Sequence, residues 1–176
     1  MQFKKLGHTD LLLPEICLGT MTFGEQNTQA EAFAQLNYAL ERGLYFWDTA
    51  EMYPVPPKAE TQGATETIIG NWIAQQGQRD QLFLASKIAG PSQGGIHIRN
   101  GQTRFIAEEI SSAIDASLKR LQTDYIDLYQ LHWPQRPTNF FGKLGYGNQE
   151  AENTQHVTDL AETLYALHHE VQKGRI

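Results

Sequence analysis

The chain has 176 residues, of which 40% are hydrophobic, and a formal net charge of −6 from 14 basic and 20 acidic side chains. This composition is typical of a soluble protein with one hydrophobic core. The acidic balance argues against a general binder of nucleic acid or of an anionic membrane surface. Cys17 is the only cysteine, which excludes a disulfide within the chain, and we expect it to be a small buried hydrophobe. No stretch resembles a signal peptide or a membrane span, so we expect a cytoplasmic protein.

Residues 1–14 are predicted to form a hairpin, with Gly7-His8-Thr9-Asp10 as its turn. Four strand–helix units are then predicted over residues 15–174. The expected strands are short apolar runs. They lie at residues 16–18, 44–47, 82–86 and 125–131.

The predicted helices carry apolar side chains every three or four residues. Thr28 and Glu31 form a capping-box signature before the first helix, and Gly43 and Gly77 are stop signals for the first two. The apolar stripes of the four helices include Phe33, Leu36 and Leu40; Ile68, Ile69, Trp72 and Ile73; Ile106, Ile110, Ile114 and Leu121; and Leu160, Leu164, Leu167 and Val171.

Strands that alternate with helices imply a parallel sheet with right-handed crossovers. A doubly wound dinucleotide fold is expected to carry G-x-G-x-x-G after its first strand, and residues 19–24 do not supply that motif. A (β/α)₈ barrel typically needs about 250 residues. We therefore predict a TIM-barrel fold truncated to its first four βα units, with residues 175–176 as the start of a fifth strand.

Polar side chains follow three successive predicted strands where each strand ends. Asp48 ends the second strand, Tyr53 follows in a proline-rich loop, Lys87 ends the third strand and His132 ends the fourth. The carboxyl ends of parallel strands meet at one face of the fold, where chemistry is usually built. Asp48 alone is more typical of a turn residue, but the four side chains together predict a catalytic site.

These four residue types suit proton transfer to a carbonyl oxygen. A free tyrosine has a pKa of about 10, and an ammonium beside a phenol hydroxyl lowers that pKa toward neutral pH. We expect Asp48 to hold Lys87 charged and in place, and His132 to orient the carbonyl of a substrate toward Tyr53.

Several motifs of the chain resemble those of the aldo-keto reductases, and within them the bacterial Tas-like branch. The similarity extends over essentially the whole chain. It is carried by Leu18-Gly19-Thr20-Met21-Thr22-Phe23-Gly24, Asp48-Thr49-Ala50-Glu51-Met52-Tyr53-Pro54-Val55-Pro56-Pro57, Ser86-Lys87 and Leu131-His132-Trp133-Pro134-Gln135-Arg136-Pro137-Thr138-Asn139.

The resemblance implies NADPH-dependent reduction of small aldehydes or ketones. It assigns Tyr53 as the proton donor, with Lys87 as its modulator, Asp48 as the partner of Lys87 and His132 as the carbonyl orienter. Near the nicotinamide ribose it places Gly19, Thr20, Met21 and Asp48.

The same resemblance places the residues that bind the 2′-phosphate of NADPH beyond Ile176. We therefore expect residues 1–176 to be the N-terminal half of such a barrel, inactive in isolation and prone to self-association. A non-enzymatic or regulatory barrel fragment remains an alternative, because fold does not determine function.

Other candidate sites carry weaker signals. We expect no metal site at His168-His169-Glu170, because the spacing of a zinc-binding helix is absent and a histidine near a helix C-terminus is favoured by the helix dipole. Asp127 is expected at the bottom of the barrel. Aromatic side chains after the fourth strand fit a substrate pocket and a packed rim equally well, namely Trp133, Phe140, Phe141 and Tyr146.

Overall fold

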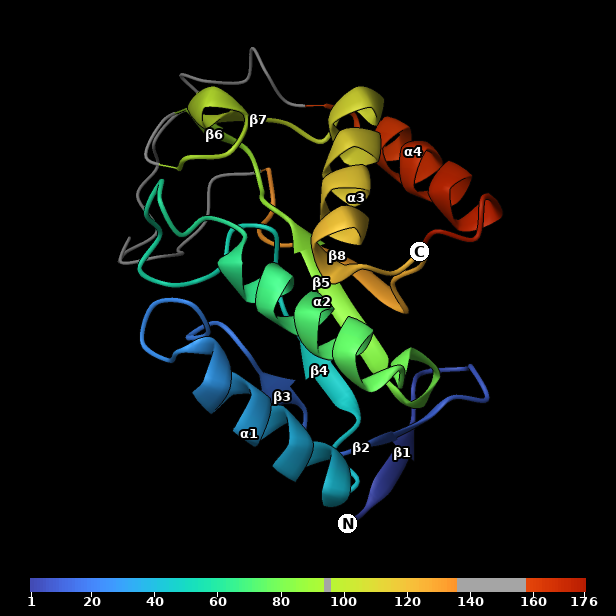
Figure 1. The fold of residues 1–176 in the computed structure, drawn as a ribbon. Helices are drawn as coiled ribbons and strands as arrows, with labels where there is room; N and C mark the ends of the chain where they lie inside the picture. Colours follow the sequence, from blue (N-terminus) through green and yellow to red (C-terminus); the bar gives the residue numbers. More distant parts are fainter. Residues whose placement is uncertain (94–95, 136–157) are drawn as a thin grey trace, which may run out of the picture.

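A computed structural model describes residues 1–93, 96–135 and 158–176 (Figure 1). The chain opens with an antiparallel hairpin of β1 (Phe3–Lys5) and β2 (Leu12–Pro14), in which Phe3 pairs with Pro14. A hairpin thus lies within residues 1–14, where the sequence predicted one.

The main sheet is parallel and has the strand order β3-β4-β5-β8. Its members are β3 (Leu18–Gly19), β4 (Phe46–Asp48), β5 (Phe83–Ile88) and β8 (Leu128–Leu131). Each strand pairs in parallel with its neighbour in the chain order of the βα units. The four predicted strands are thus confirmed, although each begins one to three residues later than its apolar run suggested.

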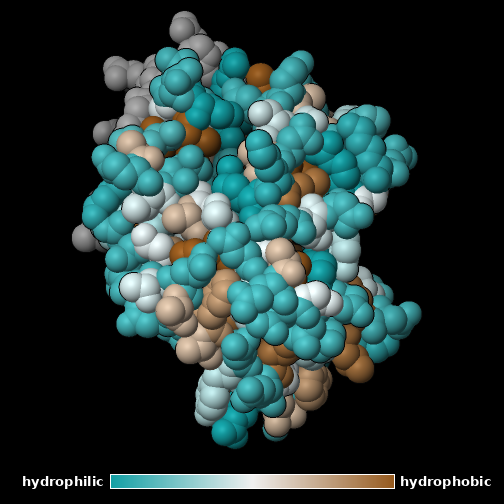
Figure 2. All heavy atoms as spheres, viewed as in Figure 1, coloured by the Kyte–Doolittle hydropathy of each residue, from teal (hydrophilic) through white to brown (hydrophobic). Residues whose placement is uncertain are grey.

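Four helices cover one face of this sheet, as Figure 1 shows. They are α1 (Gln29–Glu41), α2 (Ala64–Gln76), α3 (Ala107–Leu121) and α4 (Leu160–Gln172). Their outward surface is predominantly hydrophilic, with isolated apolar side chains (Figure 2). Among the described residues, no helix combines the length and the apolar character that crossing a bilayer requires.

The connection over residues 89–104 is more regular than its glycine content suggested. It contains a small antiparallel hairpin of β6 (Ser92–Gln93) and β7 (Gln102–Thr103), with the 3₁₀ turn η2 (Arg99–Gly101) between them. A second 3₁₀ turn, η1 (Arg79–Gln81), precedes β5. The hairpin was not predicted because its strands are only two residues long and carry no apolar alternation.

Local sequence signals explain the helix boundaries. Thr28 caps α1: its hydroxyl accepts a hydrogen bond from the Glu31 amide, and the Glu31 carboxylate accepts one from the Thr28 amide in return. Gly77 ends α2 in the left-handed conformation with φ of 65°, which costs glycine no steric strain.

The main core lies between the sheet and the helices. Trp47 of β4 and Trp72 of α2 meet edge to face with their ring centroids 4.9 Å apart, and both side chains are almost fully buried. Helices α2 and α3 approach closely at Gly70, where an added Cβ would lie 2.1 Å from the Arg120 carbonyl oxygen. The prediction that Trp72 is a core residue is confirmed.

The structure corrects the expectation for Cys17. Side chains alternate along a strand, so Cys17 lies on the same face as Gly19 rather than on the helix face with Leu18. Cys17 is exposed instead of buried. Partial enclosure, followed by the nearby Asp48 carboxylate, raises the pKa of its thiol to about 11 and keeps it protonated at neutral pH.

The stripe predicted for α4 is also only partly buried. Leu160, Leu164 and Val171 are exposed, whereas Thr163 and Glu170 on the neighbouring face of the helix are buried. The backbone after α4 turns toward β8, because the carbonyl oxygen of Arg175 accepts a hydrogen bond of 3.0 Å from the Ile126 amide. No strand is assigned to residues 175–176 themselves.

Candidate active site

The structure brings Asp48, Tyr53, Lys87 and His132 together at the carboxyl end of the sheet. The Lys87 ammonium lies 2.6 Å from Asp48 Oδ2 and 3.4 Å from the Tyr53 hydroxyl. It also donates to the carbonyl oxygen of Thr49 at 2.7 Å. The ammonium is therefore placed between a carboxylate and a phenol, which was the arrangement expected from the sequence.

Parallel pairing explains why these side chains converge. Asp48 is the last residue of β4, and its partner on β5 is Ala85, two residues before Lys87. Residues two apart on a strand share a face, so Lys87 points to the same side of the sheet as Asp48. Thr20 supports this end of β4, because its hydroxyl and its amide both donate to the Asp48 carbonyl oxygen.

Gln130 is a member of this cluster that sequence reasoning missed. Its side-chain amide donates to Asp48 Oδ1 at 3.0 Å, so that both oxygens of the carboxylate are engaged, one by Gln130 and one by Lys87. Gln130 pairs with Lys87 across β5 and β8. The signal that could have identified it is its position two residues before His132, on the same face of the strand.

His132 follows β8 and meets Tyr53 edge to face, with ring centroids 5.5 Å apart. Burial lowers the pKa of its imidazole to about 4, and the positive charge of Lys87 contributes in the same direction while Asp48 opposes it. The ring is therefore neutral at neutral pH. A neutral imidazole beside a tyrosine hydroxyl can donate a hydrogen bond to a carbonyl oxygen without bringing a second positive charge into the site.

Tyr53 is held in a packed loop although its neighbours are prolines. Its amide donates to the Ala50 carbonyl oxygen, and its own carbonyl oxygen accepts from the Gly63 amide at 2.9 Å. The side chain is 9% exposed. It belongs to a buried apolar cluster with Ala50, Met52, Ala89, Ile98 and Trp133.

Glu51 is a second residue that the sequence did not single out. It lies between Asp48 and Tyr53, is 2% exposed, and forms an ion pair with Arg99 in which two nitrogens of the guanidinium each contact one carboxylate oxygen. Nothing local in the sequence indicated this pair, because its partners are 48 residues apart.

The predicted cofactor residues Gly19, Thr20 and Met21 lie beside Asp48. Gly19 pairs with Asp48 across β3 and β4, and nothing lies within 4 Å of the position that its Cβ would occupy. Met21 is exposed, whereas Thr20 is buried with its hydroxyl bonded to the Asp48 carbonyl oxygen. Gly19 and Met21 are thus accessible to a ligand, whereas the buried Thr20 is bonded to the backbone of Asp48.

Trp133 packs beside His132, with ring centroids 5.3 Å apart. Trp133 is buried against Gly90 and donates its indole N–H to the Pro91 carbonyl oxygen at 3.1 Å, while Phe140, Phe141 and Tyr146 lie outside the described residues. Asp127 pairs with Arg79.

Glu170 forms ion pairs with Lys173 and Arg175. Over the ranges that the structure describes, no group of three potential metal ligands is found.

The family model of the aldo/keto reductases matches residues 15–176. The chain belongs to the aldo/keto reductase family. It is 49% identical over all of its residues to Protein tas of Escherichia coli, of which it covers 50%. Aldo-keto reductase YhdN of Bacillus subtilis is 36% identical over an alignment of 141 positions that covers 76% of this chain and 38% of YhdN.

Solved structures of aldo-keto reductases show the same fold. The thermostable aldo-keto reductase Tm1743 superposes on 99% of this chain with a TM-score of 0.71 and 29% identity, and 51% of Tm1743 is covered. Aldo-keto reductase AKR11C1 from Bacillus halodurans gives a TM-score of 0.69 and 28% identity, with coverage of 99% and 47%. The predicted fold class is confirmed, and the chain spans about half the length of the relatives it matches.

Proposed function

We propose that this chain carries the proton-transfer half of an NADPH-dependent aldehyde or ketone reductase. The observation that carries the proposal is the position of the Lys87 ammonium, 2.6 Å from Asp48 Oδ2 and 3.4 Å from the Tyr53 hydroxyl. A positive charge beside a phenol stabilises the phenolate that proton donation leaves behind. Tyr53 is accordingly the proton donor in this proposal.

When bound, NADPH would supply a hydride to the carbonyl carbon of the substrate. Tyr53 gives its hydroxyl proton to the carbonyl oxygen, so the C=O double bond becomes an alcohol. Lys87 stabilises the tyrosinate, and Asp48 keeps the ammonium in place. His132, neutral because its pKa is lowered to about 4, donates a hydrogen bond that aligns the carbonyl oxygen with Tyr53.

The residues present fit the nicotinamide end of such a cofactor. The open space at Gly19 leaves room for a flat ring beside Asp48, and exposed Met21 borders it. The preference for NADPH is supported by a relative of 34% identity over 119 residues, which is named Aldo-keto reductase yakc [NADP(+)] of Schizosaccharomyces pombe. Methylglyoxal reductase YeaE of Escherichia coli, 37% identical over 125 residues, supports a small carbonyl substrate.

We further propose that residues 1–176 act as the N-terminal half of a barrel, with residues 1–14 as its hairpin and 15–174 as its first four βα units. The half-length match to relatives supports this division. Four strands cannot close an eight-stranded barrel. The chain alone is accordingly expected to reduce carbonyls poorly and to gain activity when the second half of Protein tas is supplied.

The test compares the wild-type chain and Tyr53→Phe, each assembled with the second half of Escherichia coli Protein tas. Removing the hydroxyl is expected to lower kcat for aldehyde reduction by roughly two to four orders of magnitude, the usual effect of losing a general acid. The dissociation constant of NADPH, followed by fluorescence, is expected to change little. Near-normal turnover by Tyr53→Phe would contradict the role of this residue, and NADPH binding without any turnover in the wild type would favour the regulatory alternative.

A further inference from the structure

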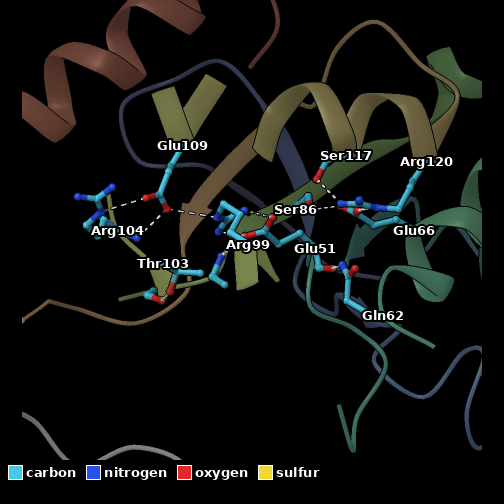
Figure 3. A network of polar contacts seen from close by, with 12 residues as sticks. Glu51, Gln62, Glu66, Ser86, Arg99, Thr103, Arg104, Glu109, Ser117 and Arg120 are labelled. Carbon is cyan, nitrogen blue, oxygen red and sulfur yellow. Dashed lines mark hydrogen bonds and ion pairs between the residues drawn. The ribbon is translucent and has the colours of Figure 1, made fainter. Parts of the chain in front are cut away.

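A buried ion pair outside the four residues of the proposed site joins the loop that carries Tyr53 to the rest of the fold. Nη1 of Arg99 lies 2.8 Å from Glu51 Oε2, and Nη2 lies 2.7 Å from Glu51 Oε1 (Figure 3). Two parallel bonds of this kind fix both the distance and the orientation of the groups that they join. Glu51 belongs to the four-residue segment between Asp48 and Tyr53, so the pair holds the loop between two members of the site.

Two further polar groups of Glu51 are bonded to the segment around Lys87. Its amide donates to the Lys87 carbonyl oxygen at 3.2 Å, and its Oε1 accepts from the Ala89 amide at 2.6 Å. Its carbonyl oxygen accepts from the Gln62 side chain at 2.7 Å. Glu51 is therefore attached to the backbone of Lys87 itself and to the residue two positions later, which ties the Tyr53 loop to the strand that carries the ammonium.

Arg99 connects this arrangement to α3. Its Nε lies 3.3 Å from Oε2 of Glu109, a residue in the first turn of that helix. Arg99 and Asn100 adopt positive φ angles of 47° and 58°, which are uncommon for residues with side chains and need support from their surroundings. The guanidinium is thus held on both sides, by Glu51 and by Glu109.

We propose that Glu51 and Arg99 are a positioning pair that sets the spacing between the Tyr53 hydroxyl and the Lys87 ammonium. The inference rests on the proposed function, because that spacing has a catalytic meaning only if Tyr53 donates the proton. Well-packed apolar side chains in place of a buried ion pair are often as stable, so stability alone does not account for this one. Its rigid, two-bonded geometry suits a loop whose hydroxyl lies 3.4 Å from the ammonium.

The chain offers a matched control in a second buried pair, Glu66 and Arg120. Glu66 is fully buried, lies 2.7 Å from Arg120 Nε, and accepts a hydrogen bond from Ser86. Ser86 precedes Lys87, and successive side chains on a strand point to opposite faces, so this pair lies on the helix side of β5. It joins the same two residue types as the first pair, through a contact of Arg120 Nε with Glu66 Oε2, but it connects α2 to α3.

The first experiment measures pH–rate profiles for three variants assembled with the second half of Protein tas: Glu51→Gln, Arg99→Lys and Glu66→Gln. Glu51→Gln and Arg99→Lys break the two-bonded geometry. Both are expected to lower kcat by roughly 10- to 100-fold, with KM for the carbonyl substrate little changed. A longer distance to Lys87 disfavours the phenolate, so the alkaline limb of each profile is expected to move to higher pH.

If the pair acted only through its charges, the alkaline limb of the pH–rate profile would not move to higher pH. Glu51→Gln removes a negative charge, which favours a nearby phenolate and would move the alkaline limb to lower pH. Arg99→Lys keeps the positive charge and would leave the profile unchanged. Either result would overturn the positioning role. Glu66→Gln is expected to lower thermal stability without moving the pH–rate profile. If its profile shifted as much as that of Glu51→Gln, the shift would reflect a general loss of packing, and the proposal would be overturned.

A second measurement needs neither cofactor nor turnover. The pKa of His132, about 4 when the ring is buried near Lys87, is read by NMR titration in the 176-residue chain, with His132→Asn to assign the signal. The charged and titratable groups around this ring are Lys87, Asp48 and Tyr53. Loosening the Tyr53 loop exposes the ring, so Glu51→Gln is expected to raise the pKa of His132 toward its usual value of about 6.5.

The two proposals fail differently. If Tyr53→Phe keeps its activity, the proposed proton donor is wrong, whatever Glu51 does. If Tyr53→Phe is inactive but Glu51→Gln leaves kcat, the pH–rate profile and the His132 titration unchanged, the function stands and the positioning role is wrong.

Discussion

At the carboxyl end of the sheet, Asp48 and Lys87 each contact several other groups of the protein. Asp48 uses one carboxylate oxygen for Lys87 and the other for Gln130, so the ion pair cannot rotate freely. Lys87 contacts a carboxylate, a carbonyl oxygen and a phenol. These contacts fix the position of an ammonium whose side chain is only 11% exposed.

The depressed pKa of His132 has a consequence for stability that can be measured. Between pH 6.5 and the folded-state pKa of about 4, the unfolded chain binds a proton at this residue and the folded chain does not. Stability is therefore fully present above pH 6.5 and is lost as the pH falls toward 4. Urea unfolding at several pH values should show a smaller decline for His132→Asn than for the wild-type chain. Equal slopes for the two proteins would show that the imidazole is not desolvated.

Pairs of elements are held at fixed distances by close backbone approach. At Gly70 of α2, a Cβ would meet the Arg120 carbonyl oxygen at 2.1 Å and the Leu121 carbonyl carbon at 2.8 Å. These are backbone atoms of the end of α3, so they cannot rotate away from an added methyl group. The spacing of the two helices therefore depends on a glycine.

Replacing Gly70 by Ala is expected to destabilise the fold by about 1–3 kcal/mol, because overpacking between the helices outweighs the roughly 1 kcal/mol that Ala gains over Gly in an open helix. Thermal or urea unfolding measures this change. Gln75→Ala, at an exposed position of the same helix, is the control and is expected to change stability by less than about 0.5 kcal/mol. A stabilising effect of Gly70→Ala would show that α2 and α3 can separate freely.

At the scale of the whole molecule, the described residues leave apolar surface uncovered. Leu160, Leu164 and Val171 of α4 are exposed, as are Ile16 and Met21 near β3. Apolar surface of this extent on a chain that spans half of its relatives favours association with another chain.

We expect the 176-residue chain to form dimers or larger species at micromolar concentrations, measured by light scattering. Replacing Leu160 and Leu164 together by Glu is expected to shift the distribution toward monomer. Tyr38→Ser, which removes an exposed aromatic side chain from α1, serves as the control and is expected to have little effect. A wild-type chain that stays monomeric at these concentrations would argue against association through this surface.

Local sequence signals determined the order of elements and the members of the proposed site. The capping box at Thr28 and the glycine after α2 depend on contacts within a few residues, so they can be predicted without the fold. Asp48, Lys87 and His132 could be brought together from the sequence alone because each ends a strand, and parallel strands end at one face.

Only the tertiary structure decided the contacts between distant segments. Glu51 with Arg99 and Asp48 with Gln130 are 48 and 82 residues apart, and no local pattern encodes such a pairing. Burial was expected for Cys17 and for the apolar stripe of α4, and this was wrong for a related reason. An apolar pattern indicates which side chains favour burial, whereas burial itself depends on which other elements are present to cover them.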